Sequence, residues 1–148
     1  MLACPQDDIR FMRLALQEAQ AAFEAQEVPI GAVVVSRGRI LARAHNLVEA
    51  LHDPTAHAEM LAITAATNAL GAKFLHNATL YVTIEPCPMC AAALHWAHLH
   101  RLVYGAKDPK RGYSIFQPGL LHPRTAVTAG IMAERCAGLM EEFFRARR

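Results

Sequence analysis

The stretch Thr83-Ile84-Glu85-Pro86-Cys87-Pro88-Met89-Cys90 decides how the rest of this chain is interpreted. Cys87 and Cys90 are three positions apart, and Pro88 between them suits the first turn of a helix, where its missing N–H is not needed. Residues three apart share one helix face, so both sulfur atoms can reach one ion. A helix N-terminus also favours thiolate, which is the form that binds metal. Alone, the pair could be a redox centre or half of a four-Cys zinc site, but the sequence holds no second C-x-x-C for the latter.

His57 and Glu59 favour a catalytic metal site instead. One His and two Cys make three protein ligands and leave one tetrahedral position for water, as in catalytic rather than structural zinc sites. The combined pattern, H-x-E followed by P-C-x-x-C, resembles the signature of zinc-dependent nucleobase deaminases, in which the Glu transfers protons and is not a ligand. We therefore predict one Zn²⁺ per chain, held by His57, Cys87 and Cys90, with Glu59 as the catalytic acid–base.

Length and composition indicate a compact globular protein rather than a membrane or disordered one. The chain has 148 residues, which predicts a single domain over 1–148, and 53% of them are hydrophobic. It holds no 18-residue apolar run and no signal-like N-terminus, so we predict no membrane contact. Cys4 and Cys136 remain outside the motif and are expected to be free thiols, which favours a reducing, cytoplasmic location.

The net charge of +2 is unevenly distributed. Residues 1–60 carry five basic and eight acidic groups, whereas residues 101–148 carry nine basic and four acidic groups. The last third therefore produces a positive field that could attract an anionic partner, although the charges alone favour a solvated face over a binding surface.

Hydrophobic patterning predicts alternating helices and strands. The expected elements are a helix over 7–27, strands over 30–36 and 39–46, a helix over 56–69, a strand over 78–84, a helix over 88–98, strands over 100–105 and 125–128, and a helix from 131. This order is typical of the α/β class with a mixed sheet of about five strands, with the zinc at the carboxyl ends of central strands. The loop over 106–123 is long enough to suggest a function.

Three details of the helices can be tested directly. Asp7 or Asp8 is expected to cap the first helix. Its buried stripe is expected to contain Ile9, Met12, Leu16, Ala19 and Phe23, and the core face of the last helix Cys136, Met140 and Phe143. His95 and His98 share a helix face near His100, but no acidic or Cys partner is close in sequence, so we predict a surface or subunit contact rather than a second metal site.

The chain resembles bacterial tRNA-specific adenosine deaminases of the cytidine deaminase-like superfamily from about residue 8 to 148. The residues that carry this resemblance are Glu27-Val28-Pro29-Ile30-Gly31-Ala32, Asn46, Asp53-Pro54-Thr55-Ala56-His57-Ala58-Glu59, Thr79-Leu80-Tyr81-Val82-Thr83-Ile84-Glu85-Pro86-Cys87, Met89-Cys90, Gly105-Ala106-Lys107-Asp108 and Glu142-Phe143-Phe144-Arg145. The resemblance implies a three-layer α/β/α fold, a homodimer, and hydrolysis of adenosine to inosine and ammonia at the wobble position of tRNA.

The same resemblance implies roles for residues around the zinc. Those expected to contact the substrate base or sugar are Val28, Pro29, Ile30, Asn46, Ala58, Pro86 and Asp108. Those expected to contact the tRNA anticodon stem-loop are Lys107, Lys110, Arg111, Phe144 and Arg145.

Two other functions stay open at this point. Residues 109–116 and 121–123 depart from the pattern of the tRNA enzymes, because the loop is shorter and more aromatic. This leaves a small-molecule deaminase of the same superfamily, acting on guanine, cytosine or a nucleoside, as the alternative. A non-catalytic, zinc-stabilised RNA-binding protein is a weaker third possibility, because Glu59 is present and no fourth ligand is evident.

Overall fold

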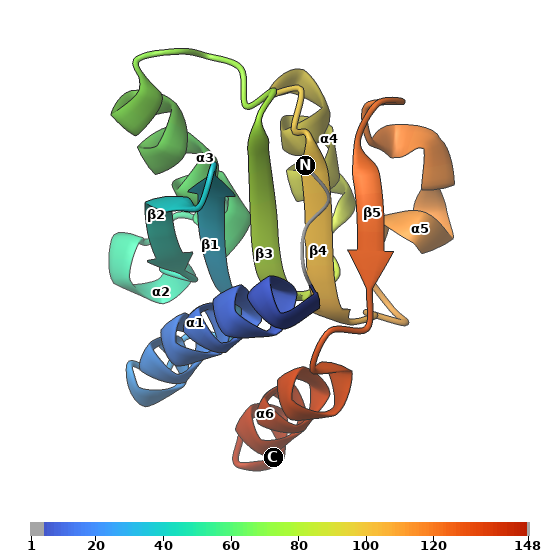
Figure 1. Cartoon of the computed structure of the whole chain (residues 1–148). Coiled ribbons are helices and arrows are strands. Elements are labelled where there is room, and N and C mark those ends of the chain that lie inside the picture. Colours follow the sequence, from blue (N-terminus) through green and yellow to red (C-terminus); the bar gives the residue numbers. More distant parts are fainter. Residues whose placement is uncertain (1–4, 148) are drawn as a thin grey trace.

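Strand β3, Ala78–Ile84, lies at the centre of a five-stranded mixed sheet (Figure 1). The structure is a computed structural model that describes residues 5–147. The sheet order is β2-β1-β3-β4-β5; β1 pairs antiparallel with both β2 and β3, and β3, β4 and β5 run parallel. Six of the seven residues of β3 are buried, as expected for a strand covered on both faces.

The bounds of the elements agree closely with the sequence prediction. The strands are β1 Gly31–Ser36, β2 Arg39–His45, β3, β4 Arg101–Ala106 and β5 Ala126–Ala129. The helices are α1 Pro5–Glu24, α2 Val48–Leu51, α3 Ala58–Leu70, α4 Pro88–Trp96, α5 Tyr113–Phe116, the 3₁₀ turn η1 Pro118–Leu120, and α6 Ala133–Arg145. Only α2, α5 and η1 were not predicted, because segments of three or four residues are too short to show a hydrophobic period.

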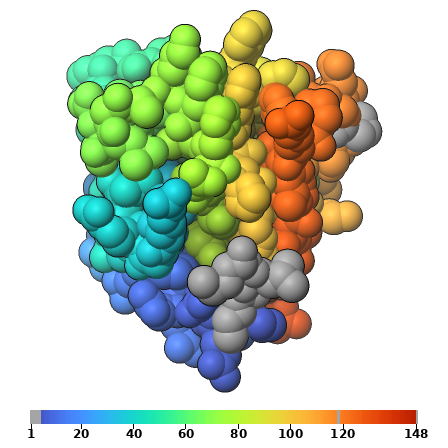
Figure 2. Space-filling view, turned by 45° about the horizontal axis from the view of Figure 1, so that its top comes forward, coloured from blue at the N-terminus to red at the C-terminus, as the bar shows by residue number. Residues whose placement is uncertain are grey.

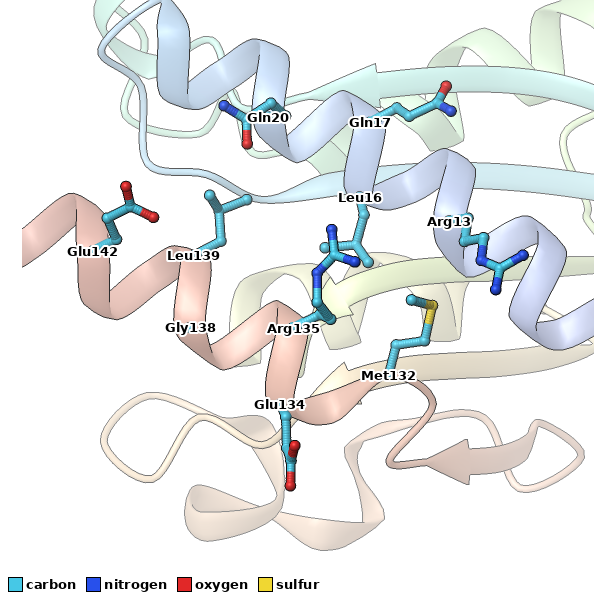
Figure 3. A pocket seen from close by; sticks show the side chains of 10 residues that line it. All are labelled: Arg13, Leu16, Gln17, Gln20, Met132, Glu134, Arg135, Gly138, Leu139 and Glu142. Atoms are coloured by element: carbon cyan, nitrogen blue, oxygen red, sulfur yellow. The ribbon is translucent and has the colours of Figure 1, made fainter.

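Helices cover both faces of the sheet and confirm the three-layer α/β/α architecture. Helices α1 and α6 pack on one face, where Met12, Val33 and Val103 form part of the core. Helices α3 and α4 pack on the other face, around Leu80, Leu94 and Leu102. A groove of about 740 Å³ runs between α1 and α6 on the outer surface (Figure 3).

Helix α1 differs from its prediction at its first turn. It includes Pro5, so neither Asp7 nor Asp8 is its cap. Asp8 is instead buried among the core residues, and Ile9, expected in the stripe, is 39% exposed. Phe11 is buried in place of Ile9. The buried residues of α1 recur every three or four positions from Asp8 to Ala22, and Ile9 lies outside this series.

The remaining predictions for the helix faces hold. Met12, Leu16 and Ala19 are buried, and Phe23 makes an edge contact with the ring of Phe143. In α6 Cys136 and Phe143 are buried and Met140 packs against the same cluster. Cys4 and Arg148 lie outside the described residues. Within residues 5–147 no helix is both long and apolar enough to span a membrane.

The amino-terminal edge of the parallel strands gathers imidazole side chains. Figure 2 shows the segments near residues 75, 98 and 122 side by side along this edge. His95 and His98 do meet there, but with His76 and His122 rather than His100; His76 Nε2 is 3.3 Å from His98 Nδ1. Among residues 5–147, these rings do not bring three metal-ligating atoms together, and the predicted surface or subunit contact stays a prediction.

Candidate active site

Two helix N-termini meet at the opposite, carboxyl edge of the sheet. His57 is the residue before α3 and Cys87 the residue before α4, and both have extended backbone angles, with ψ of 152° and 168°. Pro88 opens α4, as its fixed φ allows, and β3 delivers Cys87 directly after Glu85 and Pro86. His57 and Glu59 can therefore reach one site although they are only two residues apart, because the chain turns into α3 between them.

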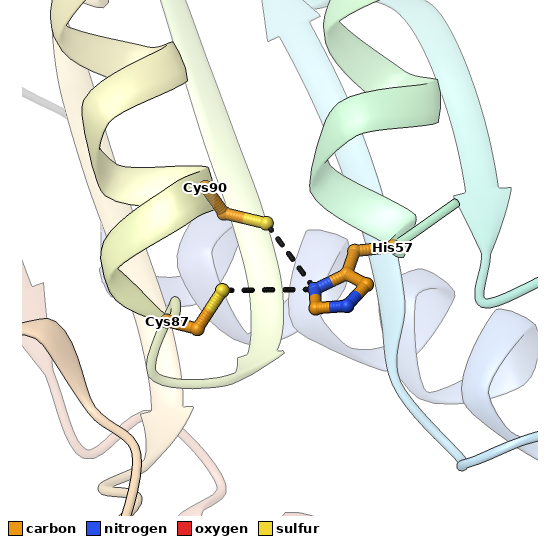
Figure 4. Close-up of side chains that lie close together, drawn as sticks. All are labelled: His57, Cys87 and Cys90. Carbon is orange, nitrogen blue, oxygen red and sulfur yellow. Dashed lines mark hydrogen bonds between the residues drawn. The ribbon is translucent and has the colours of Figure 1, made fainter. Parts of the chain in front are cut away.

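The three predicted ligands converge (Figure 4). His57 Nδ1 lies 3.6 Å from Cys87 Sγ and 3.5 Å from Cys90 Sγ, and the three ligand atoms all lie within 4.8 Å of one another. Tetrahedral zinc with usual Zn–N and Zn–S lengths would separate such nitrogen and sulfur atoms by about 3.6 Å. The donor set and its spacing thus fit a zinc ion. Cys136, a buried residue of α6, lies in the core on the opposite face of the sheet.

Glu59 lies beside these ligands in the first turn of α3. Its side chain is 3% exposed, and its Oε1 has no hydrogen-bond partner among residues 5–147. Burial raises the pKa of Glu59 to about 7, against the opposing effect of its own backbone N–H. An unpaired, buried carboxylate oxygen is a costly feature for a purely structural residue, which points to a role in chemistry.

Hydrogen bonds around the Cys87 thiol favour its thiolate form. A hydrogen bond from Cys90 lowers the pKa of Cys87 to about 4, despite the opposing effect of burial, and a further bond with His57 contributes. The pKa of His57 is raised, chiefly by its bond with Cys87. Cys87 is therefore stabilised as thiolate, the form in which Cys binds zinc, whereas the hydrogen bond with Cys87 raises the pKa of Cys90.

A cleft of about 1710 Å³ opens onto His57, Glu59 and Cys87. Of the residues predicted to contact substrate, four line it: Val28, Ile30, Asn46 and Asp108. The other three, Pro29, Ala58 and Pro86, are buried beside the cleft and are not among its lining residues. The predicted contacts of all seven with substrate stay predictions.

The basic residues of the last third divide between the cleft and other surfaces. Those lining the cleft are Lys107, Lys110, Arg111, Arg145 and Arg147, with Phe144 among them. Arg101 instead forms a salt bridge with Asp8 at 2.8 Å, and Arg124 precedes β5 at the far edge of the sheet. Glu24, Glu49 and Glu141 also line the cleft, so its positive charge is local to the 107–111 segment and the end of α6.

Two buried carboxylates in the walls of the cleft were not predicted. Glu27, 1% exposed, accepts hydrogen bonds from the backbone N–H of Glu49 and Ala50 and so holds α2 in place. Glu85, 4% exposed, accepts bonds from Asp108 and Ser114 in the opposite wall. In both cases the sequence shows a charged residue next to an apolar segment, which is a signal of burial. The groups that form hydrogen bonds with these carboxylates, however, are far away in the sequence and could not be identified from it.

Comparison with known proteins agrees with this geometry. The model of the MafB19-like deaminase family matches residues 6–148. The tRNA-specific adenosine deaminase of Bacillus subtilis is 47% identical over 145 residues, covering 95% of this chain and 89% of that protein. That of Agrobacterium fabrum is 47% identical over 143 residues, covering 93% of this chain and 94% of that protein.

Solved structures show the same fold. One from a study of A-to-I editing by tRNA:A34 deaminases has a TM-score of 0.82 and 47% identity, covering 88% of this chain and 98% of that chain. The guanine deaminase of Nitrosomonas europaea has a TM-score of 0.83 at 26% identity, covering 97% of this chain and 86% of that chain. Because the family model spans nearly all of the chain, and tRNA-specific adenosine deaminases are 47% identical to it over most of its length, the chain belongs to the MafB19-like deaminase family and is a relative of the tRNA-specific adenosine deaminases.

Proposed function

We propose that this protein is a zinc-dependent hydrolase that converts adenosine to inosine at the wobble position of tRNA, with release of ammonia. The observation that carries the proposal is the buried, unpaired Glu59 carboxylate beside a three-ligand His57, Cys87 and Cys90 site. Identity over the whole chain favours adenosine in tRNA over guanine as the substrate. The tRNA deaminases are 47% identical over 93–95% of this chain, whereas one guanine deaminase is 26% identical and another is 41% identical over only 66% of this chain.

His57, Cys87 and Cys90 would hold the zinc ion. When bound, zinc would acidify a water molecule, lowering its pKa from about 16 toward about 7. Glu59 accepts one proton of that water while the water oxygen adds to C6 of adenine, and passes this proton to the ring nitrogen. It then takes the proton of the new C6 hydroxyl and delivers it to the amine, which departs as ammonia. Glu59 ends as it began, and water and adenosine become inosine and ammonia.

The cleft supports a substrate that is a base within a nucleic-acid strand. Val28 and Ile30 supply an apolar wall, and Asn46 a polar group for base or sugar. Lys110, Arg111 and Arg145 lie on the rim, where phosphates of an anticodon stem-loop would pass, and Phe144 is 43% exposed for stacking. A free base has no phosphate and would gain little from these cations.

The direct test of substrate is a comparison of purified protein acting on an anticodon stem-loop with A34, the same stem-loop with G34, free adenosine and free guanine. We expect inosine from the A34 stem-loop alone, with equal amounts of ammonia. Efficient release of ammonia from guanine with no reaction on the stem-loop would overturn the proposal in favour of the small-molecule alternative.

The metal is tested separately by elemental analysis. We expect one zinc per chain in the wild type, loss of zinc from Cys87→Ala and Cys90→Ala, and full zinc in Cys136→Ala, which removes a buried thiol on the other face of the sheet. Zinc retained after loss of both Cys87 and Cys90 would refute the assigned ligands.

We also propose a homodimer in a reducing, cytoplasmic compartment. Trp96 at the end of α4 and Phe116 in the neighbouring α5 are 77% and 63% exposed, which suits an interface. Sedimentation of wild type and Trp96→Ser tests this: we expect a dimer that the substitution weakens, and a wild-type monomer at all concentrations would exclude it.

A further inference from the structure

The carboxylate of Glu85 connects the segment that carries the zinc ligands to the far wall of the cleft. Its Oε1 accepts a hydrogen bond from the N–H of Asp108 at 3.2 Å. Its Oε2 accepts two from Ser114, one from the N–H at 3.1 Å and one from the hydroxyl at 2.6 Å. Glu85 therefore holds the 107–114 segment at both ends.

The backbone around Glu85 joins the same two segments. The N–H of Glu85 donates to the carbonyl of Ala106 at 2.8 Å, and the N–H of Tyr113 donates to the carbonyl of Pro86 at 2.9 Å. Cys87 follows Pro86 directly, so the position of the 107–114 segment is fixed relative to a zinc ligand through one continuous set of bonds.

Gly112 shows how closely the 107–114 segment encloses this carboxylate. A Cβ at position 112 would lie 2.4 Å from Glu85 Cδ and 2.4 Å from its Oε1, closer than non-bonded atoms approach. Position 112 therefore accepts only glycine while Glu85 keeps this place. The 107–114 segment folds around the Glu85 carboxylate. An ionised carboxylate can only accept hydrogen bonds, and the segment supplies the donors.

The side chain of Asp108 extends these hydrogen bonds to the turn that follows it. Its Oδ1 accepts bonds from the N–H groups of Lys110 and Arg111, both at 3.0 Å. Asp108 is itself bonded to Glu85 through its backbone, so a shift of Glu85 would move the turn that presents Lys110 and Arg111 to the cleft.

We propose that Glu85 is a positioning residue for substrate selection: it sets the place of the 107–114 wall, and with it Asp108, Lys110 and Arg111, relative to the metal ligands. This inference rests on the proposed function, because the wall selects only if the cleft takes the anticodon adenosine. Glu85 itself does not touch the reacting atoms.

Glu85→Gln is the main test. Gln can turn its oxygen toward the two donors of Ser114, but its NH₂ then faces the N–H of Asp108, so the Asp108 end of the segment is released. We expect KM for the A34 stem-loop to rise at least about tenfold with kcat changed less than about threefold, because binding is lost and Glu59 and the ligands stay in place. A variant that is merely less well folded would lose active protein, which lowers apparent kcat and leaves KM unchanged.

Asp8→Asn is the matched control. Asp8 is also a buried carboxylate that accepts three hydrogen bonds, from Tyr81 and twice from Arg101, but it lies outside the cleft. We expect it to destabilise the fold while KM stays within about twofold of wild type. Equal increases in KM for the Asp8 and Glu85 variants would refute a specific role for Glu85.

Hydrogen exchange gives a readout that needs no substrate. In Glu85→Gln the amides of Asp108 and Ser114 should exchange at least about tenfold faster, since a bond to a charged acceptor is lost or weakened. The amides of Glu49 and Ala50, held by the equivalent carboxylate Glu27, should not change. Unchanged exchange at Asp108 would overturn the proposal even if the variant were less active.

A double substitution tests the enclosure of the carboxylate. Gly112→Ala alone should raise KM as Glu85→Ala does, and the two together should raise it no further, since Glu85→Ala removes the atoms that the new Cβ would meet. Independent, multiplying effects would contradict a shared cause. If wild type fails on the stem-loop, the proposed function fails, whereas the exchange experiment still decides whether Glu85 positions the wall.

Discussion

At the residue scale, we propose that Glu59 carries the proton transfers and does not hold the metal. We predict that Glu59→Gln keeps one zinc per chain and a wild-type fold, because the proposed ligands are His57, Cys87 and Cys90. Turnover on the stem-loop should fall by about 10²–10⁴, the usual contribution of a general acid–base, and toward the larger end since one group serves several transfers. Glu49→Gln, which changes an exposed carboxylate in the same cleft, is the control. Near wild-type turnover in Glu59→Gln would assign the base to another residue.

Asp8 gives a residue-scale prediction about stability and pH. The hydrogen bonds from Arg101 hold the pKa of Asp8 below its usual value of 3.8, and the Tyr81 hydroxyl contributes, while burial opposes them. A carboxyl with a lowered pKa in the folded state stabilises the fold above its unfolded pKa and loses that contribution as pH falls through the folded value. Asp8→Asn should therefore reduce the free energy of unfolding at pH 7 by about 2–4 kcal/mol, and the difference from wild type should shrink below about pH 4.

Denaturant titrations at pH 7 and near pH 3 measure this difference. Asp7→Asn is the matched control, because Asp7 is half exposed and 3.9 Å from Arg10. Its effect should be under about 1 kcal/mol at either pH. A pH-independent difference for Asp8→Asn would show that the charge of Asp8 is not what stabilises the fold.

At the scale of elements, the distance between α1 and the sheet depends on Gly31. A Cβ there would lie 2.0 Å from the carbonyl oxygen of Ala15 and 2.5 Å from the nitrogen of Ala19, both in the backbone of α1. Gly31→Ala must push α1 away from β1, and we predict a loss of at least about 2 kcal/mol in the free energy of unfolding. Gly138→Ala in α6, where a Cβ meets no atom within 4 Å, should instead add about 0.5–1 kcal/mol. Thermal unfolding of both variants checks the two signs.

At the scale of the whole molecule, the 107–111 segment and the end of α6 bring positive side chains to the cleft where the proposed substrate would lie. We predict that stem-loop binding weakens as salt rises, with a log–log slope of about −0.7 per phosphate neutralised on single-stranded segments. Lys110→Ala with Arg145→Ala should make the slope shallower by about 1.4, since both line the cleft. Arg124→Ala removes one positive charge at the opposite edge of the sheet and should leave the slope unchanged. Equal effects of Arg124 and Arg145 would mean that only net charge matters.

The sequence by itself determined the order of strands and helices along the chain, the class of fold, and the three residues whose ligand atoms converge, His57, Cys87 and Cys90. Each of these depends on local pattern: the apolar period of α1, the continuous apolar runs of β1 and β3, and the spacing of Cys87 and Cys90. The sequence also placed Glu59 beside the ligands, because an i, i+2 pair can share a site only at a helix end.

Only the tertiary structure decided which charges act and which are neutralised. Asp8 looked like a helix cap and Arg101 like a free cation, yet they meet across 93 positions of sequence in a buried pair. The sequence analysis assigned no role to Glu27 or Glu85, yet each organises one wall of the cleft through backbone N–H groups more than 20 residues away. The physical reason is that a hydrogen bond or a salt bridge between distant segments leaves no periodic trace in the sequence, and only the packed sheet and helices bring its two partners together.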